Sequence, residues 1–384
     1  SWTDTQEFSV NAQMHNMKHL PKFLIDKYSF NHYGDEYFAR YCRRGVFRSY
    51  SYGYVRNGLQ LDFIGSLHAF NVYTVIRYYA KENRIRLEDD IKDFTTSNEF
   101  VLFDFIEVSG KNDECFGIYN KFSNNPINAK KIDGYTSWYN HYQNISESQI
   151  LNSVNSISKA GHELFQIDDG YQTAIGDFCS VDPKKFPNGL KVIADTIHSK
   201  NMMAGVWLAP VTCAKNSTIY RDHPDWLVRD KDGKPVRGGC NWSGFYGLDI
   251  YNHDVQEHIK EMLKFMVLDN GFDLLKLDFL YTAGLGYRTD RTRAQVMADT
   301  MKFIRENSYG AKIIGCGVQL FSCIGYVDYC RIGMDVSLIF DDVWFMKFMH
   351  RERISTKLTV INTMFRRQLD GIYCLNDPDV YLLR

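Results

Sequence analysis

The chain has 384 residues, of which 45% are hydrophobic, and a formal net charge of −1 at pH 7. This length can form one large core and a second domain, and the balanced charge argues against nucleic acid or an anionic membrane surface as partners. The nine cysteines form no CxxC pair, so we expect reduced thiols in a cytoplasmic protein rather than a disulfide framework or a zinc ribbon. No apolar segment is long enough to span a bilayer.

Residues 1–125 are predicted to form a β-sandwich-like domain. Alternating apolar and polar residues, which are typical of half-buried strands, occur in Gly58–Ile64, Val72–Tyr79 and Phe100–Ile106. The dipeptide Asn57-Gly58 is typical of a tight hairpin turn. The Asn-Asn-Pro sequence at 124–126 predicts a linker to the next domain.

Residues 126–384 show a different pattern, in which predicted strands alternate with helices. We expect strands at Gly134–Tyr139, Leu164–Ile167, Met203–Leu208, Leu274–Leu280, Ile313–Cys316, Tyr329–Ile332 and Gly371–Leu375. A seventh strand is harder to place, and we expect it before a helix at 356–369, which makes Gly371–Leu375 the eighth. Repeated strand–helix units after a β-rich domain predict an α/β fold with a (β/α)₈ TIM barrel, in preference to a doubly wound sheet.

Apolar stripes and end signals define the helices. Ser146, with Gln149 three residues later, predicts a capping box that opens a helix through Ala160. Apolar residues at positions i, i+3, i+4 and i+7 predict a helix that begins at Leu190. A second apolar stripe, from Val255 to Met266, predicts another helix that is expected to stop at Gly271. Another is predicted for 291–307.

The stretch Asp273–Tyr281 is the centre of this pattern, because it is a buried strand that carries two charges. Lys276 and Asp278 are two residues apart, so they lie on the same face of a strand. A cation and a carboxylate in a buried interior need each other or a polar ligand. A structural Lys–Asp pair and a functional site are both compatible with this strand alone.

Polar residues follow the other predicted strands, and barrel enzymes have their active sites at those strand ends. Carboxylates, cations and indoles are thus expected at one mouth, a combination that suits a sugar because its hydroxyls need donors and acceptors. Purely structural roles are the alternatives. One of the adjacent Asp168 and Asp169 could serve simply as a helix cap, and each tryptophan could simply fill the core. The residues concerned are Trp138, Asp168, Asp169, Trp207, Lys276, Asp278, Cys316, Arg331, Asp335 and the segment 376–379.

Several other chemistries lack their sequence signals. There is no HExxH sequence, and the histidines show no ligand spacing with cysteines, so we expect no metal. The segment 315–317 (GCG) is too short for a phosphate loop, and a GxSxG nucleophile elbow is absent. We therefore expect no cofactor.

Five short segments, in order along the chain, resemble the family 36 α-galactosidases of the glycoside hydrolases, and family 27 shares parts of the pattern. The resemblance extends from Asp133 to the C-terminus and more faintly to the N-terminal domain. Tyr171 departs from it, since Trp often follows Asp-Asp-Gly in such enzymes. The segments are 165–172 (FQIDDGYQ), 185–190 (KFPNGL), 205–207 (GVW), 275–278 (LKLD) and 376–379 (NDPD).

The resemblance implies a retaining glycosidase that releases terminal α-linked galactose. It assigns Asp278 as nucleophile and Asp335 as acid/base, with Asp341 and Asp342 as rival positions for the second role. Lys276 beside Asp278 is expected to keep the nucleophile ionised by lowering its pKa. The remaining residues would bind the substrate: Trp138, Asp168, Asp169, Trp207, Lys276, Cys316, Arg331 and Asp379.

Related activities remain open on the same scaffold. They are an α-N-acetylgalactosaminidase, a raffinose-synthase-like transglycosylase and a non-catalytic carbohydrate-binding protein. The presence of both expected catalytic carboxylates argues against the last. The expected partner is an α-galactoside or a related oligosaccharide, with homo-oligomer formation left open. We also expect the chain to lack the small C-terminal β-domain that such enzymes usually carry.

Overall fold

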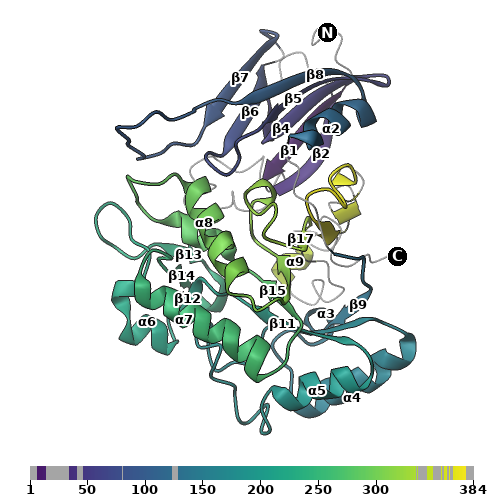
Figure 1. Cartoon of the computed structure of the whole chain (residues 1–384), viewed down its shortest axis with the longest axis vertical. Coiled ribbons are helices and arrows are strands. Elements are labelled where there is room, and N and C mark those ends of the chain that lie inside the picture. Colours follow the sequence, from purple (N-terminus) through teal and green to yellow (C-terminus); the bar gives the residue numbers. More distant parts are fainter. Residues whose placement is uncertain are drawn as a thin grey trace.

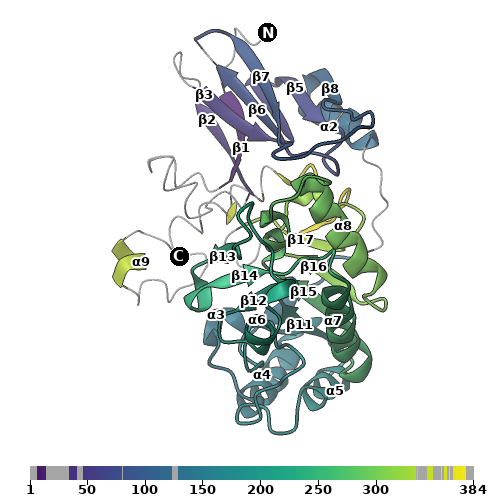
Figure 2. The same cartoon turned by 90° about the vertical axis from the view of Figure 1, so that its left-hand side faces the viewer.

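The computed structural model describes residues 7–13, 34–40, 46–79, 81–122, 129–333, 335, 344–348, 356, 359–360, 363 and 366–377. An N-terminal group of strands sits on one end of a larger part in which helices surround a sheet (Figures 1 and 2). The predicted linker at 124–126 lies outside the described residues. Within the described ranges, no helix combines the length and the hydropathy needed to cross a bilayer.

The N-terminal part consists of two antiparallel sheets, and whether they form a sandwich remains a prediction. The predicted hairpin is confirmed, because Gly58, with φ 59°, turns the chain between two paired strands. The predicted strand Phe100–Ile106 is misplaced, since the observed strand starts only at Phe105. In spatial order the sheets are β2 (Gly34–Arg40), β1 (Glu7–Gln13), β4 (Tyr52–Asn57), β5 (Gln60–Ser66) and β8 (Phe105–Lys111), and then β3 (Val46–Tyr50), β6 (Thr74–Tyr79) and β7 (Arg84–Asp89).

The sequence did not predict helix α2 (Asn112–Lys121), which packs on β5 and β8. Its apolar side is small, and a glycine within it lowers its helix propensity, so the periodic signal is weak. Two of its aromatic rings nevertheless anchor it: Phe116 and Tyr119 each lie 5.1 Å from the ring of Phe63.

The two parts of the molecule meet through aromatic side chains. Phe321, from the C-terminal part, lies edge-on to Tyr52, with ring centroids 5.7 Å apart, and also contacts Tyr119. Tyr373 packs on Phe321, and its hydroxyl donates to Asn120 Oδ1 at 2.7 Å. These residues belong to one continuous buried cluster, so the N-terminal part and the sheet below it share a core.

The C-terminal part is built on a curled sheet of seven parallel strands, which confirms the α/β class and most predicted strand positions. Closure into an eight-stranded barrel remains a prediction. Neighbouring strands pair in parallel throughout, and their order equals the order along the chain. They are β9 (Gly134–Thr136), β10 (Leu164–Ile167), β11 (Met203–Leu208), β15 (Leu274–Leu277), β16 (Lys312–Gly315), β17 (Tyr329–Arg331) and β18 (Leu375–Asp377).

The predicted eighth strand is wrong in position and in rank. The observed strand begins at Leu375, where the predicted one ends, and it pairs directly with β17, so it is the seventh strand of the sheet. A parallel crossover normally contains a helix, and the predicted helix at 356–369 stands before this strand.

Long helices lie outside the sheet (Figure 1). Their buried stripes match the prediction, as Ile193, Ala194 and Ile197 of α5 show, and Gly271, with φ 83°, follows the end of the predicted second stripe. The long helices are α4 (Glu147–Ala160), α5 (Lys191–Ser199), α7 (His253–Lys264), continued by the π-helical η5 (Phe265–Asp269), and α8 (Arg293–Glu306).

Short helices and strands lie mostly in the loops that follow the strands of the sheet. They are α3 (Trp138–His141), β12 (Thr212–Ala214), α6 (Thr218–Asp222), η3 (Pro224–Trp226), β13 (Arg237–Gly239), η4 (Asn241–Ser243), β14 (Phe245–Gly247), η6 (Leu280–Leu285), η7 (Leu320–Ser322) and α9 (Trp344–Phe348).

Two local predictions need correction. The first strand of the sheet ends at Thr136, and Trp138 begins helix α3 instead of extending the strand. Helix α4 begins where predicted, but Ser146 Oγ bonds to the side chain of Gln149 at 3.0 Å, without capping a backbone N–H. A complete capping box forms at Thr292, which opens α8.

Candidate active site

The centre of the site is a buried ion pair that crosses the sheet. Lys276 on β15 reaches past β11 and donates to Asp168 Oδ2 at 2.7 Å, with 7% and 3% of the two side chains exposed. Burial by itself would lower the pKa of Lys276, but the surrounding negative charges, Asp168 foremost, raise it above its ordinary value. Lys276 is therefore a permanent cation whose partner is Asp168 and not its strand neighbour Asp278.

Asp169 has a separate environment, and the interpretation of either aspartate as a helix cap is wrong. Its carboxylate accepts hydrogen bonds from the side-chain amides of Gln143 and Gln172, both at 2.5 Å, and from Trp242 Nε1 at 3.2 Å. Burial raises the pKa of Asp169. Gly170 completes the turn at φ 129°, where a Cβ atom would lie 2.7 Å from the carbonyl oxygen of Gln143.

Asp278 stands immediately after β15, at its carboxyl end. Its Oδ1 accepts from the backbone N–H of Phe279 at 2.7 Å, and its Oδ2 accepts from Trp207 Nε1 at 3.2 Å. The buried thiol of Cys316 lowers the pKa of this carboxyl group. Phe279 has φ 53°, a conformation that is uncommon for such a residue. The turn thus fixes the carboxylate through one backbone donor and one side-chain donor.

The expected electrostatic effect on Asp278 is only partly correct. Burial raises the pKa of this carboxyl group, Lys276 opposes that rise, and the charge of Asp335 adds to it. The net result is a raised pKa, because desolvation outweighs the attraction of the lysine. The predicted direction of the lysine's effect is therefore correct, but this effect is smaller than the effect of desolvation, so the net pKa of Asp278 is raised.

Asp335 follows β17 and has 42% of its side chain exposed. Arg331 donates to its Oδ1 at 2.9 Å, and Trp138 Nε1 donates to its Oδ2 at 3.3 Å. The carboxyl groups of Asp278 and Asp335 thus each receive one indole N–H. The remaining predicted positions, Asp341, Asp342 and Asp379, lie outside the described residues.

The sequence missed two residues of this cluster, Trp242 and Gln143. Trp242 comes from the loop that enters β14, lies 4.9 Å from Phe279 between ring centroids, and neighbours Trp207 at 6.2 Å. A tryptophan in a long loop between strands was the available signal. Gln143 had none, because a single glutamine after a short helix is indistinguishable from a surface residue.

The assembled cluster has the chemistry of a polyol site that contains several carboxyl groups. Donors and acceptors alternate around aromatic rings, and the two carboxyl groups that influence each other differ in exposure. Within the part of the chain that the structure describes, no group of three or more His, Cys, Asp or Glu side chains could hold a metal ion.

The buried pair gives a direct test of the arrangement. Lys276→Met should lower the free energy of unfolding by about 3–5 kcal/mol, because it leaves Asp168 as a buried charge without its partner. The double variant Lys276→Met/Asp168→Leu should regain most of that loss. Urea unfolding of the protein measures both changes.

The matched control is Lys191→Met, which removes a lysine from an exposed pair with Asp195. It should cost less than about 1 kcal/mol. Equal losses for the two lysine variants would contradict the buried pair.

Comparison with known proteins agrees with the geometry. Residues 130–299 match the family model named Melibiase. A segment is 29% identical over 161 residues to α-galactosidase Mel36A of Lactobacillus acidophilus, covering 40% of this chain and 21% of that protein. A match over 161 residues is 30% identical to the A type blood α-D-galactosamine galactosaminidase of Flavonifractor plautii, covering 40% of this chain and 15% of that protein.

A solved structure extends the likeness to more of the chain. TtGalA, an α-galactosidase from Thermus thermophilus in complex with stachyose, is similar at a TM-score of 0.72 and 26% identity, covering 87% of this chain and 70% of that one. The matched segments span only about a fifth of the length of the curated α-galactosidases. Sequence and fold together identify this chain as a relative of the family 36 α-galactosidases, with its melibiase segment at residues 130–299.

Proposed function

We propose that the protein is a retaining glycoside hydrolase that releases terminal α-linked galactose. The observation that carries the proposal is the pair of unlike carboxyl groups: Asp278 is half-buried and held by two hydrogen-bond donors, whereas Asp335 has 42% of its side chain exposed. Retaining glycosidases use two carboxyl groups roughly 5–5.5 Å apart, one as nucleophile and one as acid/base. The charge of Asp335 raises the pKa of Asp278, which supports the placement of both carboxyl groups at one site.

The environments of the two carboxyl groups suit different roles. Asp278 is fixed in direction and desolvated, so its ionised form is a pre-aligned nucleophile for the anomeric carbon. Asp335 has access to solvent, as an acid/base must, because it first protonates the leaving oxygen and later deprotonates a water. Arg331 and Trp138 each donate a hydrogen bond to Asp335 and so hold its carboxyl group in place.

The surrounding residues would bind the galactose hydroxyls and ring. The Lys276–Asp168 pair offers a donor and acceptor together, and Asp169 offers a further acceptor. Trp138 and Trp207 would form walls, with Cys316, Arg331 and Asp379 near the reacting end. Neither a metal nor a nucleotide enters this mechanism. The stachyose complex of the Thermus relative supports an α-galactoside as substrate.

A second candidate substrate comes from the similarity to the Flavonifractor enzyme, whose name specifies a galactosamine. Residues near Arg331 and Cys316 would decide whether a bulkier 2-substituent fits. Side-by-side rates on an aryl α-galactoside and the matching N-acetylgalactosaminide distinguish the two, and we expect the plain galactoside to react faster.

The nucleophile can be tested by removing its carboxylate. Asp278→Gly should abolish hydrolysis, because no covalent glycosyl-enzyme can form. External azide should then restore part of the turnover of an activated aryl α-galactoside and give the product of inverted configuration. Asp273→Asn, at the opposite end of the same strand, is the control and should keep its activity. Full activity of Asp278→Gly without azide would exclude this residue as nucleophile.

The acid/base can be tested by comparing leaving groups. Asp335→Ala should lose about 10²–10⁴-fold in activity on natural oligosaccharides, whose leaving groups need protonation. It should still form the glycosyl-enzyme from substrates with acidic phenols, and azide should speed the second step with retained configuration. Normal cleavage of melibiose by this variant, with loss in Asp341→Ala or Asp342→Ala, would move the role to one of those residues.

The coupling between the two carboxyl groups predicts a pH effect. Because the charge of Asp335 raises the pKa of Asp278, Asp335→Asn should lower that pKa. The acidic limb of kcat/KM for an activated aryl α-galactoside should then move to lower pH, since Asp278 must be ionised to react. Asp273→Asn should leave the limb in place. A limb that moves to higher pH in Asp335→Asn would contradict the coupling.

A further inference from the structure

A second polar cavity, of about 190 Å³, lies beside η6, and none of the predicted site residues lines it. Its walls come from four places: Lys92 of the N-terminal part, the segment 225–230, Asp249, and residues 283–296 in and after η6. The volume equals that of about six waters. It is smaller than the usual pocket for a drug-sized ligand, so it suits one small polar molecule.

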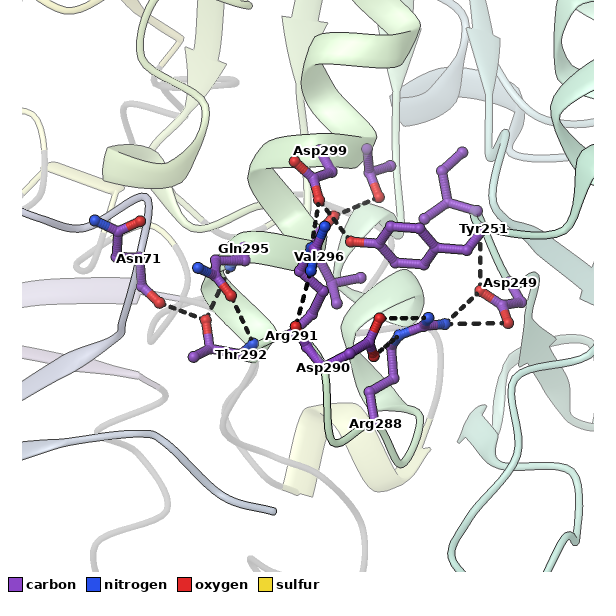
Figure 3. Close-up of polar contacts among 12 residues, drawn as sticks. Asn71, Asp249, Tyr251, Arg288, Asp290, Arg291, Thr292, Gln295, Val296 and Asp299 are labelled. Carbon is purple, nitrogen blue, oxygen red and sulfur yellow. Dashed lines mark hydrogen bonds and ion pairs between the residues drawn. The ribbon is translucent and has the colours of Figure 1, made fainter. Parts of the chain in front are cut away.

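The inner wall of this cavity is rigid before any ligand arrives. Arg288 lies over the ring of Tyr251, 4.0 Å from its centroid, and donates to Asp249 at 3.2 Å and to Asp290 at 3.1 Å (Figure 3). The Tyr251 hydroxyl in turn donates to Asp299 at 2.6 Å. Groups held in this way bind without a large loss of side-chain entropy.

The charges at the cavity balance closely. Lys92, Arg288, Arg291 and Arg293 each pair with a carboxylate and Arg229 is held by backbone carbonyl groups, so charged groups of both signs surround the cavity and most are already paired. A ligand must then offer donors and acceptors together. The five cations are Lys92, Arg229, Arg288, Arg291 and Arg293, the three lining carboxylates are Asp225, Asp230 and Asp249, and three more, Asp90, Asp290 and Asp299, pair with the arginines.

Two residues at the cavity add features that a sugar would use. Tyr287 is 45% exposed, so its ring can cover the apolar face of a pyranose. Asp225 is also exposed, and charged side chains make strong hydrogen bonds to hydroxyl groups. Arg229, held by the carbonyl groups of Pro224 and Gly233, closes the same side.

We propose that this cavity is a second sugar-binding site, which takes a single neutral pyranose and is separate from the candidate active site. Its polar groups of both signs, its rigid inner wall and its exposed tyrosine match a polyhydroxyl ring better than an ion. The choice of galactose as the probe rests on the proposed function, whereas the existence of the site does not.

Hydrogen exchange read by mass spectrometry locates the binding. Galactose, titrated into the millimolar range, should slow backbone exchange in 225–230 as well as in the active-site segment 165–172. In Tyr287→Ala, the galactose concentration that gives half-maximal protection of 225–230 should rise about tenfold. The concentration that protects 165–172 should stay unchanged. Tyr309→Ala is the matched control, because this tyrosine is 47% exposed and does not line the cavity.

The outcomes separate this proposal from the proposed function. Protection of 225–230 without protection of 165–172 would count against galactose binding at the active site and leave the second site standing. No protection of 225–230 at saturating galactose, or equal protection in Tyr287→Ala, would overturn the second site. Protection of 225–230 by sodium sulfate in place of galactose would overturn it as well, by showing an anion site.

Discussion

The buried contact between Lys276 and Asp168 is the constraint on which the site depends. Two charges withdrawn from water lose several kcal/mol of hydration each, and their attraction offsets this only when the geometry is good and other polar groups surround them. The pair meets both conditions, since Nζ and Oδ2 are 2.7 Å apart and the side chain of Gln166 also donates to Asp168. The pair joins β15 to β10 across the intervening strand. It therefore fixes the relative height of the strand ends from which the other site residues emerge.

The same interior governs the protonation of Asp278. Desolvation favours the neutral acid, the lysine favours the carboxylate, and the second carboxyl group opposes the lysine. None of these effects is visible in the spacing of Lys276 and Asp278 along the strand. The spacing correctly placed Lys276 in the buried interior, with Asp278 half-buried beside it, but the sign of the net pKa shift depends on how completely water is excluded. A carboxyl group in such a balance stays responsive to its neighbours, because a change in charge at Asp335 alters its ionised fraction.

The sequence predicted the regular parts of the fold well, and particular residues explain the failures. Met203–Leu208 and Leu164–Ile167 were predicted to the residue, because parallel strands buried on both faces are continuous apolar runs. The strand at Leu375 was misplaced, because its three residues include Asn376 and Asp377 and leave almost no apolar signal. The site residues that belong to the recognised motifs could be predicted from the sequence. Trp242 and Gln143 lie outside these motifs and contact Asp169 from loops. Only the folded structure shows such a contact between distant segments of the chain.

The N-terminal part belongs to the framework of the site, although the described site residues come from the C-terminal part alone. The chain leaves Asp278, passes through η6 and reaches α8, and the N-terminal part holds the far end of this segment. The Thr292 hydroxyl donates to the carbonyl oxygen of Asn71, as Figure 3 shows, and Arg293 Nε donates to Asp90 at 2.6 Å. One end of the segment is thus fixed by β15 and the other by the neighbouring sheets. A loop held at both ends has little freedom to change the direction of the carboxylate at its start, so the contact between the two parts contributes to the geometry of Asp278 without touching it.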